Sequence, residues 1–428
     1  MIGSISLMSI WCGALPDKPG FKSRFPPSQL NVRTLFVYNI LQGAYLGYIQ
    51  VFWQPFLLTL GLSIAAIGTL ETLTGRFGLL ASLTQVFGGR LSDRTGRRKI
   101  VLLGSVLLIS CWSTAALAFV LETKYLIYVA YPLWSLSAMA TPVLDAVLAD
   151  SVSPHDRSRI YGLIMLANVI PGALTGYATG ILVGRLHPQF FLGLAALLES
   201  AGFIVIQSKL RNIRLPPEEL AAEAEITSFK RLLRDFREYH RLFSVFAADS
   251  LSWSIATTLL PAILRASKGY TPADFGLIAV TLTVGNVLGI IPGGFLTNRI
   301  GARNLLIISE ALGLATWSGW LIRPQAIYAP LYAFMWGLAI TTWVPVQFQV
   351  LTDTFPAERR GALLGAVATF RGLIAILGPL IATLLYLKLG YSAPFIAADL
   401  GLALAIMLII LVVPKRRMAT EGDADNPQ

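Results

Sequence analysis

The chain has 428 residues, of which 55% are hydrophobic and only 13% are charged. Water-soluble domains carry about 25% charged residues, so this composition excludes a soluble enzyme, a disordered chain and a nucleic-acid module. The formal net charge is +11, but a basic excess in a membrane protein usually collects on cytoplasmic loops. At about 20 residues per bilayer crossing, the hydrophobic residues would fill close to twelve crossings.

Long apolar runs recur along the whole chain, separated by charged residues or by proline and glycine. We expect helices, because lipid offers the backbone no hydrogen-bond partner outside the segment, and because runs such as GLALAIMLIILVV lack the alternation of a membrane β-barrel. The predicted spans are 33–60, 64–90, 99–121, 125–150, 159–183, 190–208, 241–265, 274–298, 303–323, 327–352, 360–386 and 391–413. The predicted parts are a tail 1–32, a six-helix bundle 33–208, a linker 209–240, a second six-helix bundle 241–413 and a tail 414–428.

Basic residues divide unequally between the two sides of the predicted bundles. Most of the 34 lysines and arginines lie in the tails and in the loops after even-numbered helices. The opposite side carries Lys124, Arg185, Arg265, Lys268, Arg323 and Lys388. The positive-inside rule therefore predicts that both termini are cytoplasmic. Within the linker, apolar residues recur at helical spacing opposite basic ones, which predicts an amphipathic helix on the membrane surface.

Two sequence segments repeat at nearly the same separation. GGRLSDRTGRRK (88–99) matches GGFLTNRIGARN (293–304), and DSVSPHDRSRIYG (150–162) matches DTFPAERRGALLG (353–365). Each match lies at the end of an even-numbered helix, so the two halves are copies of each other. Repeats around a shared midplane site are a transporter architecture.

The first repeat also carries a family resemblance. Its residues Gly89-x-Leu91-Ser92-Asp93-Arg94-x-Gly96-Arg97-Arg98 resemble the signature loop between the second and third helices of the major facilitator superfamily. The resemblance covers about 33–413. It implies an all-α fold of two pseudo-symmetric bundles around a cavity that opens alternately to either side, and a monomer.

A cytoplasmic gate is also implied by this resemblance. In the family the matching aspartate latches the cytoplasmic side at the start of helix eleven, which is near Arg360 and Gly361 here. We therefore expect a gate built from Gly89, Asp93, Arg94, Gly96 and Arg97. The alternative is that the basic residues merely hold the topology.

Ionisable side chains inside the spans are candidates for function, because each is expensive to insert, by about 2.5–3.5 kcal/mol. Arg76 and Arg371 lie near the midplane, and a guanidinium group suits an anionic substrate because it stays charged and binds bidentately. The alternative is a structural ion pair. Asp249 is the first candidate to carry a coupling proton, followed by Asp145 and Glu71. Glu71 shares one face of its helix with several glycines, and small residues at that spacing mark close helix contact, so an interhelical hydrogen bond is favoured for Glu71.

Uncharged polar and aromatic residues complete the predicted lining, since rings and amides together suit a small organic solute. The candidates are Asn39, Gln42, Asn168, Trp253, Asn286 and Trp343. Lipid-facing aromatic residues are the alternative for the tryptophans.

No metal site or cofactor is expected, because the chain has only 2 cysteines and 3 histidines. It also lacks the P-loop pattern, so an ion gradient must drive transport.

These observations predict a multi-pass secondary transporter of the inner or plasma membrane, in contact with lipid and not with nucleic acid. It would move a small, anionic organic solute by alternating access, with a proton as the coupling ion, as in a symporter. A proton-driven exporter of hydrophobic drugs is the second reading, although helix four lacks the arginine of such exporters and Pro171, Gly172 and Gly176 match their helix-five signature only partly. A receptor without transport is a third reading, and 209–240 is too short for a signalling domain. An enzyme is not expected.

Overall fold

The structure is a computed structural model that describes residues 27–75, 78–152, 157–211, 237–355 and 360–414. All regular structure in these ranges is helical. The first half contains α2 (Pro27–Thr59), α3 (Ile64–Thr74), α4 (Leu79–Thr95), α5 (Arg97–Val120), η1 (Lys124–Leu126), α6 (Ile127–Ser137), η2 (Ala138–Ala140), α7 (Thr141–Ser151), α8 (Arg157–Leu182) and α9 (Pro188–Lys209). The second half contains α12 (His240–Thr257), α13 (Leu260–Lys268), α14 (Pro272–Ile300), α15 (Ala302–Ile322), η4 (Ala326–Tyr328), α16 (Ala329–Thr354), α17 (Arg360–Ala375), α18 (Leu377–Leu389) and α19 (Ser392–Val412).

Ten helical segments within the described ranges are long and apolar enough to cross a membrane. They confirm an all-helical, multi-pass architecture. The predicted spans 33–60 and 64–90 are not among the ten; the helix at the first, α2, carries many polar side chains, and the second is divided between α3 and α4. Twelve crossings and cytoplasmic termini therefore remain predictions, and the amphipathic linker helix lies outside the described residues.

Several predicted spans are broken helices rather than continuous rods. The span 64–90 is interrupted between the caps Gly75 and Gly78, both of which are extended. The span 241–265 breaks between α12 and α13, just before Pro261, and the span 360–386 breaks at Ile376. Proline removes a backbone donor and disfavours a helical conformation in the preceding residue, which explains the break before Pro261.

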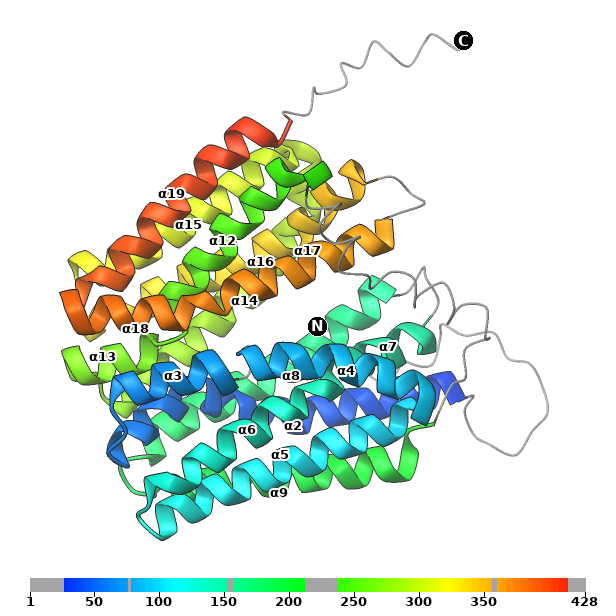
Figure 1. Cartoon of the computed structure of the whole chain (residues 1–428), viewed down its shortest axis with the longest axis vertical. Helices are drawn as coiled ribbons and strands as arrows, with labels where there is room; N and C mark the ends of the chain where they lie inside the picture. The colour runs from blue at the N-terminus through cyan, green and yellow to red at the C-terminus, as the bar shows by residue number, and fades with distance from the viewer. Residues whose placement is uncertain (1–26, 76–77, 153–156, 212–236, 356–359, 415–428) are drawn as a thin grey trace, which may run out of the picture.

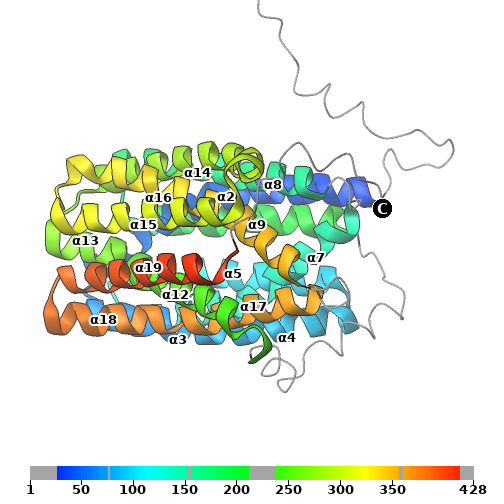
Figure 2. The same ribbon diagram turned by 90° about the horizontal axis from the view of Figure 1, so that it is seen from above.

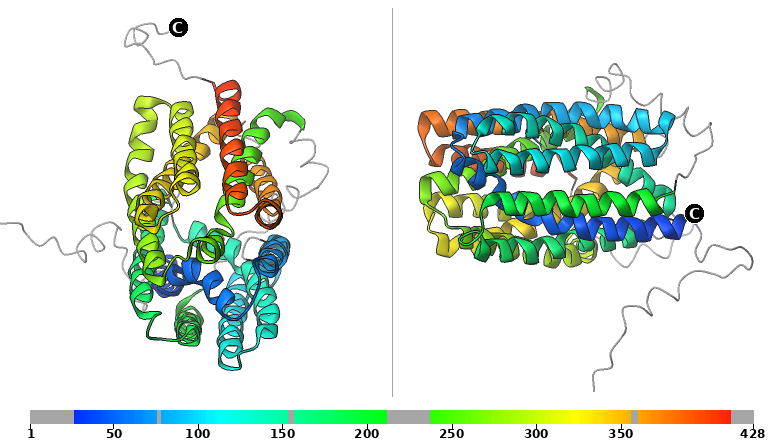
Figure 3. Two further views of the ribbon diagram at one scale, coloured as in Figure 1. Left: turned by 90° about the vertical axis from the view of Figure 1, so that its left-hand side faces the viewer. Right: turned by 90° about the horizontal axis from the view of Figure 1, so that it is seen from below.

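The two halves form two bundles whose helices all run in roughly the same direction in the view of Figure 2. In Figure 1 the first half lies below the second, and the bundles meet at the left and diverge toward the right. We call the left end, where α2 ends and α13 and α18 lie, the closed end, and the opposite end, where α2 begins and α19 ends, the open end. Seen from the closed end, the helices of each half form a separate group (Figure 3, left).

Contacts between the halves are made at the closed end by α2 with α13 and α14, by α3 with α18, and by α8 with α14. Glycines allow the closest of these approaches. A Cβ atom on Gly180 of α8 would lie 2.8 Å from the Gly276 Cα of α14, so the two backbones touch without intervening side chains. Phe52 and Phe275 add a ring contact across the same interface, with their centroids 6.1 Å apart.

The repeated sequence segments form the same turn in both halves. Gly96 joins α4 to α5 with φ +97°, and Gly301 joins α14 to α15 with φ +87°. Both conformations lie in the region that favours glycine. Gly96 and Gly301 are therefore required by the backbone conformation of this turn, independently of any gate.

Glycine is also required where α2 crosses α8 within the first half. A Cβ atom on Gly172 would lie 3.2 Å from the Gly47 Cα, and one on Gly47 would collide with the Gly172 backbone. We expect Gly47→Val to destabilise the protein by about 2 kcal/mol through overpacking, which lowers the apparent melting temperature by several degrees. Gly193→Val is the matched control, because a Cβ atom at this helical position meets no atom within 4 Å. Equal melting temperatures of the two variants would contradict the close crossing.

Candidate transport site

Two adjoining cavities lie between the halves, next to the closed end. The larger has a volume of about 340 Å³ and is lined by α2, α12, α13, α14 and single residues of other helices. The smaller has a volume of about 120 Å³ and is lined by α2, α8 and α14. Leu46, Gln50, Val51 and Leu282 line both cavities. A cargo between the bundles would therefore contact both halves at once.

Aromatic rings form much of the wall of the larger cavity. Trp53, Trp134, Trp336 and Phe275 line it together with aliphatic side chains. Trp53 and Trp134 pack edge to face, with their centroids 6.0 Å apart, which fixes both rings. Such walls bind flat or amphipathic organic molecules through apolar contact and stacking.

Glu71 is the one charged side chain among the described residues that line the two cavities. Its Oε1 accepts hydrogen bonds from the Gln54 Nε2 at 3.2 Å and from the Tyr131 hydroxyl at 3.0 Å. The Trp53 indole donates in turn to the Tyr131 hydroxyl at 2.9 Å. Glu71 thus has the interhelical hydrogen bonds expected from the glycines on its face of the helix, and it also faces the cavity.

The smaller cavity is more polar. Asn168 of α8 and Asn286 of α14 line it from opposite halves. Asn168 donates a long hydrogen bond of 3.4 Å to the Asn39 carbonyl, whereas the buried Asn286 Oδ1 accepts no hydrogen bond within the described part of the chain. A buried acceptor without a donor is costly, so Asn286 can accept a hydrogen bond from a cargo without losing another one.

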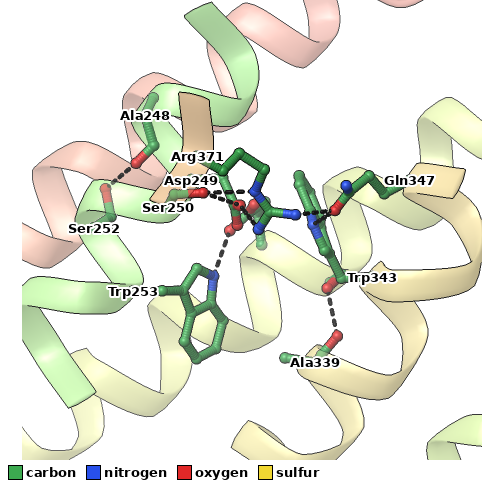
Figure 4. A network of polar contacts seen from close by, with 11 residues as sticks. Ala248, Asp249, Ser250, Ser252, Trp253, Ala339, Trp343, Gln347 and Arg371 are labelled. Atoms are coloured by element: carbon green, nitrogen blue, oxygen red, sulfur yellow. Dashed lines mark hydrogen bonds and ion pairs between the residues drawn. The ribbon is translucent and has the colours of Figure 1, made fainter. Parts of the chain in front are cut away.

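Arg371 of α17 lies in the second bundle, in a network with residues of α12 and α16 (Figure 4). Its guanidinium group donates to the Asp249 carboxylate at 2.7 Å and to the Ser250 hydroxyl at 2.7 Å, and it contacts Gln347. The Asp249 side chain is 2% exposed and that of Arg371 is 28% exposed. The positive charge is therefore balanced by a buried carboxylate, although part of the guanidinium group remains accessible.

Glu310 of α15 adds a second carboxyl group to this network. The carboxyl groups of Asp249 and Glu310 lie near each other, the Trp253 indole donates to the Glu310 Oε2 at 3.3 Å, and the buried Glu310 Oε1 accepts no hydrogen bond within the described part of the chain. Two neighbouring buried carboxylates repel each other, which favours a proton on one of them. The cluster of Arg371, Asp249 and Glu310 thus combines one positive charge with a site that can hold a proton.

A buried carboxylate occupies the corresponding region of the first half. Glu199 of α9 accepts hydrogen bonds from the hydroxyl groups of Tyr38 at 3.0 Å, Tyr45 at 2.8 Å and Ser105 at 2.6 Å. The sequence repeat pairs Ser105 of α5 with Glu310 of α15. As ionisable side chains inside predicted spans, Glu199 and Glu310 are candidates for function from the sequence, but sequence analysis gave them no specific role; this repeat is the signal that could have connected them.

The other predicted lining residues lie outside the two cavities. Asn39 donates within its own helix to the Leu35 carbonyl, and Gln42 donates to the Tyr38 hydroxyl. Trp253 contacts Glu310, and Trp343 donates to Gln347 at 2.8 Å. Gln42, Trp253 and Trp343 therefore support the carboxyl and arginine networks. Contact of these residues and of Asn39 with substrate remains a prediction.

Among the predicted charged residues that the structure describes, Asp145 and Glu71 are not joined to the Arg371 network. Asp145 is exposed, and its backbone carbonyl accepts from the Tyr161 hydroxyl. Arg76 lies outside the described residues. The proposed pairing of Arg371 with a carboxylate is thus made by Asp249.

The predicted gate is described only in part, because the side chains of Asp93 and Arg94 lie outside the description. Arg97 forms an ion pair with Asp150 of α7. A Cβ atom on Gly89 would meet open space, whereas one on the preceding Gly88 would collide with Met139. In this conformation the close helix approach is made by Gly88, and a gating role of the motif remains a prediction.

Gln54 was missed by sequence analysis, although it contacts both halves. The residue is 6% exposed. Besides Glu71, it bonds to the Thr258 carbonyl at 2.5 Å and to the Ala262 N–H at 3.2 Å, both in the second half. The sequence offered a weak signal, since Gln54 follows Gln50 by one helical turn.

Comparison with known proteins identifies the family. The model of the Major Facilitator Superfamily matches residues 35–248 and 242–428, which together span nearly the whole chain. The chain belongs to the major facilitator superfamily. This membership makes the protein a membrane transporter of small molecules and not an enzyme.

Individual members of the superfamily are only distantly similar. The Multidrug resistance protein 2 of Bacillus subtilis (strain 168) is 24% identical over 365 residues, which cover 82% of this chain and 88% of that protein. The class D Tetracycline resistance protein of Salmonella ordonez is 24% identical over 348 residues, covering 77% and 83%. The solved nucleoside transporter NupG has the same fold, with a TM-score of 0.67, 13% identity and coverage of 90% and 98%.

The Asp249–Arg371 pair gives a direct stability prediction. Replacing Arg371 by methionine leaves the buried Asp249 carboxylate without its positive partner, so we expect a loss of about 3 kcal/mol and a lower apparent melting temperature. The double variant Asp249→Asn/Arg371→Met removes both charges and should recover much of this loss. Thermal unfolding of the purified proteins measures both, and a double variant no more stable than Arg371→Met would contradict the pairing.

Proposed function

We propose that this transporter exchanges a small aromatic amphiphile, neutral or positively charged, for protons. The observation that carries the proposal is the lining of the 340 Å³ cavity, where aromatic walls surround Glu71. Apolar rings bind the body of such a cargo, and a carboxylate attracts a positive group and repels a negative one. The volume falls within the usual range of about 300–1,000 Å³ for small-molecule sites.

The coupling proton is assigned to the cluster of Asp249, Glu310 and Arg371. Protonation of the Asp249–Glu310 pair removes a negative charge and weakens the attraction for Arg371. Arg371 bonds to groups on α12 and α16, so a change in its pairing alters how α17 packs on these helices. This is a physical route from a proton to a movement of the second bundle.

The relatives support outward transport. Two of them are named for resistance to drugs or to tetracycline, and removal of a compound from the cell explains resistance through a transporter. We infer that the protein lies in the cell membrane as a monomer and works by alternating access. With cytoplasmic termini, the open end of this conformation faces the cytoplasm, where the cargo enters.

An aromatic anion moved by proton symport is the second candidate. It is favoured by the partial exposure of Arg371, whose side chain is 28% accessible. For this function a cargo carboxylate would have to replace Asp249 as the partner of the guanidinium group. Because Asp249 is already bound at 2.7 Å, we rank this function below the first.

Transport in vesicles separates the two candidates. We expect proteoliposomes with an acidic interior to accumulate ethidium, an aromatic cation, because protons leave in exchange for the dye. Asp249→Asn should abolish accumulation against the gradient, and Glu71→Gln should raise the KM on the order of tenfold, as expected for loss of a charged contact. Asp274→Asn, which keeps the oxygen that caps α14, is the control. Uptake of an aromatic acid driven by an alkaline interior, with no movement of ethidium, would reverse the ranking.

A further inference from the structure

The side chain of Gln54 is inserted into the main chain of the opposite half. It lies on α2, and its amide contacts the break between α12 and α13. Its Nε2 donates to the Thr258 carbonyl at 2.5 Å, and its Oε1 accepts from the Ala262 N–H at 3.2 Å. In a continuous α-helix these two backbone groups, four residues apart, would bond to each other. The Gln54 amide therefore takes the place of one backbone hydrogen bond.

Insertion of a side chain into the backbone ladder is a known cause of helix breaks. Here it acts together with Pro261, which lacks a donor of its own. The neighbouring Ile263 N–H still reaches the Leu259 carbonyl at 2.9 Å, so the helix resumes directly after the break. When Gln54 withdraws, the two freed groups can pair with each other, and neither is left unsatisfied.

Glu71 orients this amide from within the first half. The Gln54 Nε2 also donates to the Glu71 Oε1, with 3.2 Å between the nitrogen and the oxygen, and the Tyr131 hydroxyl donates to the same oxygen at 3.0 Å. A hydrogen bond to a carboxylate is about twice as strong as one between neutral groups. The position of Gln54 therefore depends on the charge of Glu71, which faces the cavity.

We propose that Gln54 is the latch of the closed end and that Glu71 is the positioning residue that sets it. The proposal rests on the proposed function, in which the positive group of a cargo binds the Glu71 carboxylate and neutralises its charge. Neutralisation of Glu71 weakens its hold on the amide, Gln54 leaves the break between α12 and α13, and the closed end is free to open. Binding of a cargo in the cavity and opening of the closed end are thereby linked through the side chain of Gln54.

A distance measurement across the closed end tests the latch. Spin labels are placed on Lys124→Cys and Lys388→Cys, which replace exposed residues of the two halves at this end, in a Cys12→Ser background. The remaining Cys111 is fully buried. Pulsed dipolar spectroscopy on the full chain in nanodiscs, without cargo or gradient, gives the distribution of distances between the two labels. The measured ratio is the population of molecules with the long distance, in which the closed end has opened, divided by the population with the short distance.

We expect Gln54→Leu, which keeps the volume and removes the hydrogen bonds, to raise this ratio on the order of tenfold. Gln50→Leu is the matched control: it changes an amide one turn away that lines the same cavity, and the ratio should stay unchanged. If Gln54→Leu does not fold, Gln54→Asn replaces it, since its amide is too short to reach the break. Equal ratios for the position 54 and position 50 variants overturn the latch.

The link to Glu71 is tested by a double-variant cycle. Glu71→Gln should raise the ratio by less than Gln54→Leu, and it should add nothing in the Gln54→Leu background, because the two residues act as a unit. A Glu71→Gln effect that persists in full without Gln54 overturns the coupling. These measurements contain no cargo, so they test the latch separately from the cargo class. If the latch is wrong, the expected transport of ethidium is unaffected; if the cargo class is wrong, the expected distances are unaffected.

Discussion

A charged side chain within a bilayer is stable only where the protein supplies its partners, and this constraint organises the interior of the molecule. Glu199 is held by three hydroxyl groups, Glu71 by an amide and a hydroxyl group, and Asp249 by Arg371. The three arrangements differ in what they permit. Glu199 lies in the interior of one bundle, Asp249 shares its surroundings with a second carboxyl group, and Glu71 faces a cavity between the bundles.

This distribution separates binding from coupling. The cavity with Glu71 lies between the halves near the closed end, whereas the Arg371 cluster lies within the second bundle. A cargo and a proton can therefore act at different places and still affect the same movement. The halves meet through small residues and backbone contacts such as that of Gly180 with Gly276. The same interface also buries side chains from both halves, such as Phe52 and Phe275.

The sequence predicted the helical architecture well, because lipid restricts the backbone to helices and hydropathy records this restriction directly. It missed the break between α12 and α13, which depends on Gln54 from a distant segment as well as on Pro261. Arg371 and Asp249 were each found as charges inside spans, and their pairing was one of several alternatives. Which of the aromatic and amide side chains line the cavity could not be read from one chain, since the lining combines separate helices from both halves.

The proposed cavity selects its cargo by the negative charge of Glu71 and by its aromatic wall. Tetraphenylphosphonium and tetraphenylborate test this selection most directly, because they have nearly the same shape and opposite charges. Their binding to the purified protein can be followed by quenching of tryptophan fluorescence, since Trp53, Trp134 and Trp336 line the cavity. We expect the cation to bind more tightly than the anion and this preference to disappear in Glu71→Gln. Tighter binding of the borate, or a preference that Glu71→Gln leaves unchanged, would contradict selection by Glu71.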